Sequence, residues 1–204
     1  MKITENLKKH IRDNIILYFI LVLSLMIGIA SGAITINMLN PTQKKELIDF
    51  LNSFFRVLNT NIDNSVLLKH SLENNIYIFL IVLILGISII GGPLILGVVL
   101  LRGFIIGFTV GFLVKEVGMK GVLFSTLVIV PQNIFIIPWI LIASAISLCF
   151  SLRIIKNKFN KSIKINLLNE MLRYSFIMTI LSVLLVIGSF VESYITPMFM
   201  KLLN

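Results

Sequence analysis

Two long apolar segments without a charged residue, 76–101 and 121–152, constrain this chain more than any other feature of its sequence. Each is longer than the roughly 20 residues that cross the hydrocarbon core of a bilayer as a helix. Charged residues make up 13% of the 204 residues, well below the roughly 25% that is usual in soluble domains. The chain is therefore predicted to be an integral membrane protein, with one all-α domain over residues 1–204.

The net charge of +9 does not indicate a nucleic-acid-binding protein. The basic residues lie beside apolar spans and do not form a stripe interleaved with aromatic residues on a soluble scaffold. We interpret them as topology signals that also attract anionic lipid headgroups, so the lipid bilayer is a predicted partner and nucleic acid is not. The single cysteine, Cys149, excludes an intramolecular disulfide and offers no metal cluster.

The distribution of charges predicts how the chain is threaded through the membrane. The loop 37–75 carries as many acidic as basic residues, whereas the segment 153–173 is strongly basic. The positive-inside rule places the basic segment and the N-terminus in the cytoplasm and the neutral loop outside. The predicted topology has its N-terminus inside and its C-terminus outside, with five spans at about 15–36, 76–92, 93–114, 121–152 and 174–194.

The fourth predicted span contains two prolines, Pro131 and Pro138. Each removes a backbone donor and clashes with the preceding turn, so we expect this span to be kinked or broken. Two amides, Gln132 and Asn133, lie between the prolines and are costly in lipid unless they are hydrogen-bonded. We expect them either to tie freed carbonyls to a neighbouring helix or to line a substrate or ion site.

The outer loop is predicted to contain a short interfacial helix. Asn40 and Pro41 are suited to the cap and the first position of a helix. The apolar residues that follow recur at helical spacing, opposite charged and polar ones. Such a helix lies on the outer leaflet or against the bundle, and it can also serve as a docking surface for a partner. The candidate docking residues are Leu47, Phe50, Leu51, Phe54 and Leu58.

Glycines at four-residue spacing predict close helix packing in two spans. The third span contains Gly103, Gly107 and Gly111, and the first contains Gly28 and Gly32. Small residues at this period let helix backbones approach closely in lipid. Packing inside the bundle and homodimerisation through the same face are both compatible with the pattern.

Arg102 is the one charged residue well inside an apolar region. Charges within the membrane are candidates for function by default. The alternative is that Arg102 extends toward the interface or pairs with backbone carbonyls near Pro93. Glu192, near the outer end of the fifth span, needs no special role if it is partly exposed.

Groups that could support catalysis are scarce. The two histidines, His10 and His70, lie on opposite sides of the membrane in the predicted topology. The sequence has no cluster with metal-ligand spacing, no nucleophile elbow and no P-loop. An enzyme, a cofactor and a bound metal are therefore not expected.

The order of these parts resembles the stage II sporulation protein M family of bacterial membrane proteins. The resemblance covers nearly the whole chain and includes the glycine-rich hairpin GGPLILGVVLLRGFIIGFTVGF and the element PQNIFIIP. Many relatives outside spore formers have histidine, glycine and a later glutamate where this chain has Gln132, Asn133 and Ile136. The chain therefore resembles the sporulation branch, without the ionisable groups of the wider family.

This resemblance implies a role in endospore formation, in the mother-cell membrane at the sporulation septum. It implies a non-enzymatic scaffold that is required for engulfment of the forespore and localises two peptidoglycan hydrolases. These are sporulation protein P, an amidase, and sporulation protein D, a lytic transglycosylase. The docking surface would be the loop 37–75 together with the turn 114–120.

Two other functions are compatible with the residues. A permease-like subunit that works with an ATPase is suggested by the polar proline-containing span and the basic cytoplasmic segment. A nonspecific amphipathic membrane remodeller is suggested only by the interfacial helix, and five spans argue against peripheral action.

Overall fold

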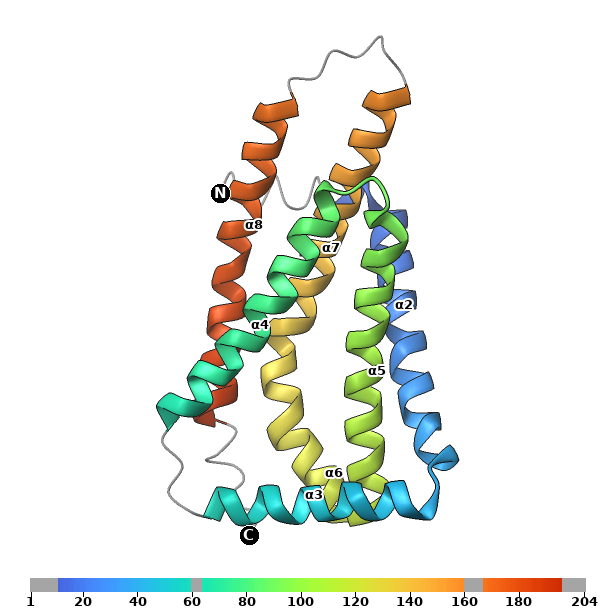
Figure 1. The fold of residues 1–204 in the computed structure, drawn as a ribbon, viewed down its shortest axis with the longest axis vertical. Helices are drawn as coiled ribbons and strands as arrows, with labels where there is room; N and C mark the ends of the chain where they lie inside the picture. The colour runs from blue at the N-terminus through green and yellow to red at the C-terminus, as the bar shows by residue number, and fades with distance from the viewer. Residues whose placement is uncertain (1–10, 60–63, 160–166, 196–204) are drawn as a thin grey trace.

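Five long apolar helices form one bundle, and a further amphipathic helix lies crosswise at one of its ends (Figure 1). This structure, a computed structural model, describes residues 11–59, 64–159 and 167–195. No strand occurs within these ranges. The predictions of an all-α fold and of five apolar helices long enough to cross a membrane are therefore confirmed for the described residues.

The bundle has five principal helices, whose bounds are α2 (Ile15–Thr35), α4 (Asn64–Ile87), α5 (Gly91–Val117), α7 (Val130–Phe159) and α8 (Leu167–Phe190). Short segments extend three of them, namely η1 (Ile36–Met38) after α2, α6 (Met119–Phe124) with η2 (Ser125–Ile129) before α7, and η3 (Val191–Ile195) after α8. The crosswise helix is α3 (Pro41–Asn59), which begins at the proline expected to start it. The side chain of Gln43 accepts a hydrogen bond from the backbone N–H of Asn40 (3.1 Å) and so caps this start.

The second span differs from the prediction. Helix α4 begins at Asn64 rather than at residue 76, so much of the predicted outer loop is helical. Its first turns are polar, but Ser71 and Asn75 are buried, and both side chains hydrogen-bond to the end of the fifth span. A boundary drawn at the last polar residue therefore missed about three turns of helix.

The turn between α4 and α5 also lies elsewhere than predicted. It occupies residues 88–90, and Gly91, Gly92 and Pro93 form the first turn of α5 instead of dividing the spans. The Ser88 carbonyl accepts hydrogen bonds from the Gly91 N–H (3.2 Å) and from the Ser151 hydroxyl (2.8 Å) on α7. The apolar turn thus satisfies its polar groups internally, as a segment next to hydrocarbon must.

The fourth span is helical without interruption from residue 119 to residue 159. It contains a π-helical turn at η2, directly before Val130 and Pro131, and Pro138 lies inside α7. The chain is therefore not broken at the prolines, and a kink of the helix axis stays a prediction. Ser151 meets the 88–90 turn, so the last residues of α7 extend beyond that turn.

Two groups of helices make up the bundle. Helices α2 and α5 form the most extensive interface, whereas α4, α7 and α8 pack on one another around Trp139, Met178 and Val82. Helix α5 joins the groups because it also contacts α4 and α7. Helix α3 lies at the end opposite the 88–90 turn (Figure 1). Which end faces the cytoplasm stays a prediction.

Candidate functional site

The glycines of the first and third spans face one another. A Cβ atom added to Gly28 or Gly32 would lie 2.2 Å from the carbonyl oxygen of Leu100 or Phe104 on α5. A Cβ atom added to Gly107 would lie 2.0 Å from the Ile29 carbonyl oxygen on α2. Real Cβ atoms do not come this close to backbone, so these positions admit no side chain.

Gly103 and Gly111 extend the same contact along α5. A Cβ atom on Gly103 would lie 2.4 Å from the Leu25 carbonyl oxygen, and one on Gly111 would lie 2.6 Å from the end of the Ile36 side chain. The predicted glycine stripes thus pack against each other inside one chain. A homodimer, which stays a prediction, would have to use another surface.

Glu192, in the π-helical turn η3, takes part in a buried polar network on α4 and α8. The Ser71 hydroxyl donates to the Glu192 carboxylate (2.5 Å), and the Asn75 amide donates to the Ser189 hydroxyl (2.9 Å). Ser71, Asn75 and Ser189 are all buried. A π-helical turn widens a helix locally and is frequent at functional sites. Sequence analysis gave Glu192 no special role, because a partly exposed carboxylate near the outer end of the fifth span needs none.

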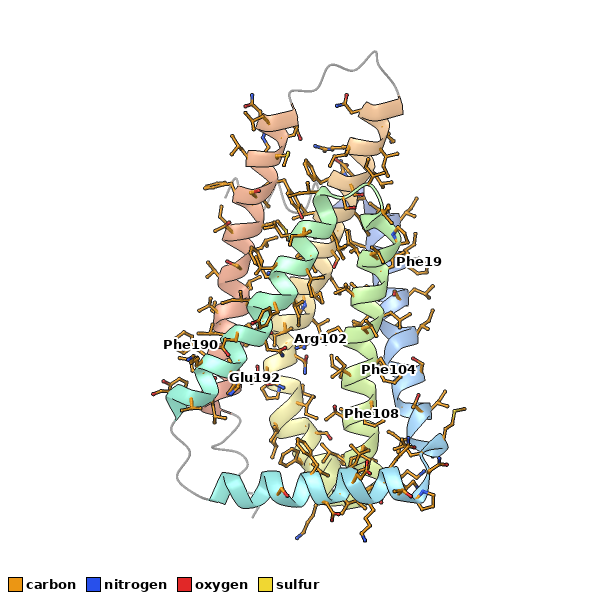
Figure 2. The ribbon with its side chains drawn as sticks, viewed as in Figure 1. Phe19, Arg102, Phe104, Phe108, Phe190 and Glu192 are labelled. Atoms are coloured by element: carbon orange, nitrogen blue, oxygen red, sulfur yellow. The ribbon has the colours of Figure 1, made fainter. Side chains whose placement is uncertain are left out.

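Arg102 on α5 and Glu192 in η3 carry opposite charges, and both are labelled in Figure 2. No direct ion pair links them among the described residues, and the Arg102 Nε atom is buried without a hydrogen-bond partner. In the part of the chain that the structure describes, no hydrogen bond joins Arg102 to the carbonyls near Pro93. The carboxylate of Glu192 is therefore a candidate counter-charge for Arg102, without a direct contact between the two side chains.

The proline-bracketed amides are only partly satisfied. The Asn133 amide donates to the Ile129 carbonyl (2.8 Å) in its own helix, not to a neighbouring helix as one interpretation expected. A short side chain readily reaches back to the carbonyl four residues earlier. The Oδ1 atom of Asn133, like Oε1 of Gln132, is buried without a partner. Both oxygens could accept a hydrogen bond from water or from a ligand, so the substrate-site interpretation stays open.

A second polar junction, which sequence analysis missed, lies between α4, α7 and α8. The Tyr174 hydroxyl donates to the Leu83 carbonyl (3.1 Å) and is 2.8 Å from the Ser147 hydroxyl. Its ring stacks on Phe150 with 4.5 Å between centroids. A Cβ atom on Gly86 would lie 2.2 Å from this hydroxyl, so the glycine provides the space for it.

The candidate docking residues on α3 are not equivalent. Leu47 and Leu51 are half-buried, whereas Phe50 is 67% exposed. The side chains of Phe54 and Leu58 lie outside the described residues. Lys44 lies 4.0 Å from Glu116 at the end of α5, and this ion pair links α3 to the bundle. The described part of the chain contains no group of three or more metal-ligating side chains.

The sequence profile of the stage II sporulation protein M family matches residues 20–197. The chain belongs to this family. No curated protein and no solved structure matched the chain. The match covers all five apolar helices except the start of α2, so the family identity applies to the whole bundle. As a member of the stage II sporulation protein M family, the chain is a multi-pass membrane protein related to sporulation.

Proposed function

We propose that this protein is a non-enzymatic membrane scaffold of endospore formation, required when the mother cell engulfs the forespore. In this role it localises peptidoglycan hydrolases at the septum, within the mother-cell membrane. The proposed partners are the amidase sporulation protein P and the lytic transglycosylase sporulation protein D. Membership of the stage II sporulation protein M family is the observation that carries the proposal.

The position of α3 supports a scaffold. It is the one long amphipathic helix among the described residues, and it lies across the end of the bundle with an exposed aromatic residue, Phe50. Exposed aromatic side chains are frequent anchors of protein interfaces. The outward face of α3 is therefore the proposed docking surface for the wall hydrolases, and the turn that follows α5 lies beside it.

The experiment is affinity purification of the tagged full chain from sporulating cells in mild detergent. Two variants make the test specific, Phe50→Asp and Ser53→Asp. Both add one carboxylate to an exposed position of α3, but only the first removes the aromatic side chain. We expect the hydrolases to co-purify with the unchanged chain and with Ser53→Asp, and to fall about tenfold with Phe50→Asp.

Equal recovery of the hydrolases with both variants would place the docking surface elsewhere. Recovery of an ATPase in place of hydrolases would favour the second candidate, a permease-like subunit. The buried, unpartnered oxygens of Gln132 and Asn133 favour that candidate, together with the intramembrane charges of Arg102 and Glu192. In a permease-like subunit, leucine at both amide positions would abolish transport. In a scaffold, the same change would leave the recovery of hydrolases unchanged.

A further inference from the structure

An apolar groove follows the outer surface of the contact between α2 and α5, at the end of the bundle near α3. It has a volume of about 400 Å³. Residues of both helices line it, among them Ile29, Ala33 and Val110, and Lys115 and Asn37 lie at its mouth. Gly107 and Gly111 are also among its lining residues, and Gly107 lies directly against the Ile29 backbone.

The dimensions of the groove suit one hydrocarbon chain. Its length from Ile106 to Lys115 is about 14 Å at 1.5 Å per residue, close to half of the roughly 30 Å core of a bilayer. The groove is therefore about as long as the acyl chain of a lipid in one leaflet, and its lining is largely apolar.

The mouth of the groove carries a positive charge. The Lys115 ammonium donates one hydrogen bond to the Asn37 side-chain oxygen (2.5 Å), which leaves two of its three donors for a ligand. The neighbouring carboxylate, Glu116, faces Lys44 at 4.0 Å, so its charge is compensated by another cation. An anionic group at the mouth would thus meet an ammonium group near the C-terminal end of α5.

We propose that this groove binds one anionic phospholipid of the leaflet on the α3 side. One acyl chain lies along α2 and α5, and the headgroup phosphate accepts hydrogen bonds from Lys115. The lipid completes the surface of the α2–α5 pair where its glycines leave no side chains to cover the backbone. This role is independent of which protein partner docks on α3.

Native mass spectrometry of the purified full chain tests the proposal. The detergent-solubilised protein is incubated with equal amounts of phosphatidylglycerol and phosphatidylcholine, and the retained lipid is identified. We expect one phosphatidylglycerol per chain. Lys115→Glu should reduce its retention about tenfold or more, whereas Lys120→Glu, the same charge change on exposed α6, should have little effect.

A second pair of variants tests the place of the acyl chain. Val110→Trp fills the groove and should abolish retention of either lipid, whereas Ile105→Trp, on the same helix at a position 55% exposed, should not. Equal retention of the two lipids, or equal loss in Lys115→Glu and Lys120→Glu, would overturn the proposal. So would a protein partner or second chain that is lost on Val110→Trp while lipid retention is unchanged.

Discussion

The two halves of the bundle are held together by different chemistry. The α2–α5 pair brings backbone against backbone through glycines, and the Ser24 hydroxyl donates a hydrogen bond to the Leu96 carbonyl (3.0 Å). The α4–α7–α8 group instead packs large side chains and links its helices through Tyr174, Asn75 and Ser71. Lipid tails are as apolar as the helices, so burial of apolar surface alone does not drive either association.

The difference predicts opposite sensitivities. Where two helix backbones touch, an added side-chain atom forces the helices apart, because a main chain, unlike a side chain, cannot change rotamer to make room. A contact made by polar side chains tolerates small changes of shape but loses stability when one hydrogen-bonding group is removed. The following predictions test this contrast in order of decreasing effect. Each can be followed through the fluorescence of Trp139, the single tryptophan, which is fully buried.

The largest effect is expected for Gly107→Ala. The added Cβ atom would lie 2.0 Å from the Ile29 carbonyl oxygen, so the helices must separate, at a cost of about 3 kcal/mol or more. Gly97→Ala on the same helix is the control, since its Cβ atom would meet nothing within 4 Å. Unfolding in mixed micelles should show a destabilised Gly107 variant and an unchanged or slightly stabilised control. Equal stability of the two would contradict backbone contact between α2 and α5.

The next effect is expected for the intramembrane charges. Arg102→Met leaves Glu192 without its cation, and Glu192→Gln leaves Arg102 without its anion, so each change should cost about 2 kcal/mol. The double variant should cost less than the sum of the two single changes, because the second substitution removes the charge that the first left uncompensated. Additive losses in this double-mutant cycle would mean that the two charges act independently.

Tyr174→Phe should cost about 1 kcal/mol, since it removes the hydroxyl bonded to Ser147 and Leu83 but keeps the ring stacked on Phe150. The matched control is Tyr194→Phe at a position 47% exposed, where no change in thermal unfolding is expected. A similar loss in both variants would show that the hydroxyl of Tyr174 does not join the three helices.

The smallest effect is expected for the ion pair that links α3 to the bundle. Lys44→Ala should lower stability by about 0.5 kcal/mol or less, because Lys44 and Glu116 are partly solvated and 4.0 Å apart. Increasing the salt concentration should reduce even this difference. A loss as large as that of Tyr174→Phe would mean that α3 is an integral part of the bundle.

The sequence was sufficient to predict the spans because hydrophobic length is a local property. It predicted α3 for the same reason, since an amphipathic period and the start at Pro41 can be recognised within a few turns. The predicted start of the second span was wrong because polar residues of α4 hydrogen-bond to partners more than a hundred positions away in the sequence, as Asn75 does to Ser189. No local rule separates such a polar turn from a loop.

Some residues of the candidate site were predicted and others were not, because the sequence does not show which spans face one another. The glycine spacing identified residues that pack closely, but not that Gly28 and Gly107 belong to facing stripes of one chain. Arg102 was conspicuous as an isolated charge, whereas Glu192 was not, because its hydrogen bond with Ser71 depends on how α4 packs against the end of α8. One signal could have directed attention to Glu192. Arg102 is a cation within an apolar segment and has no counter-charge nearby in the sequence, so a carboxylate from another span was to be sought.

The contact between α2 and α5 has a consequence for biosynthesis. The ribosome delivers α2 first, and α3 and α4 must follow before α5 can enter the bilayer. Until then the face of Gly28 and Gly32 has no backbone partner on α5. Because the third span closes this contact with the first, the N-terminal half of the bundle can be completed only after α5 has been made.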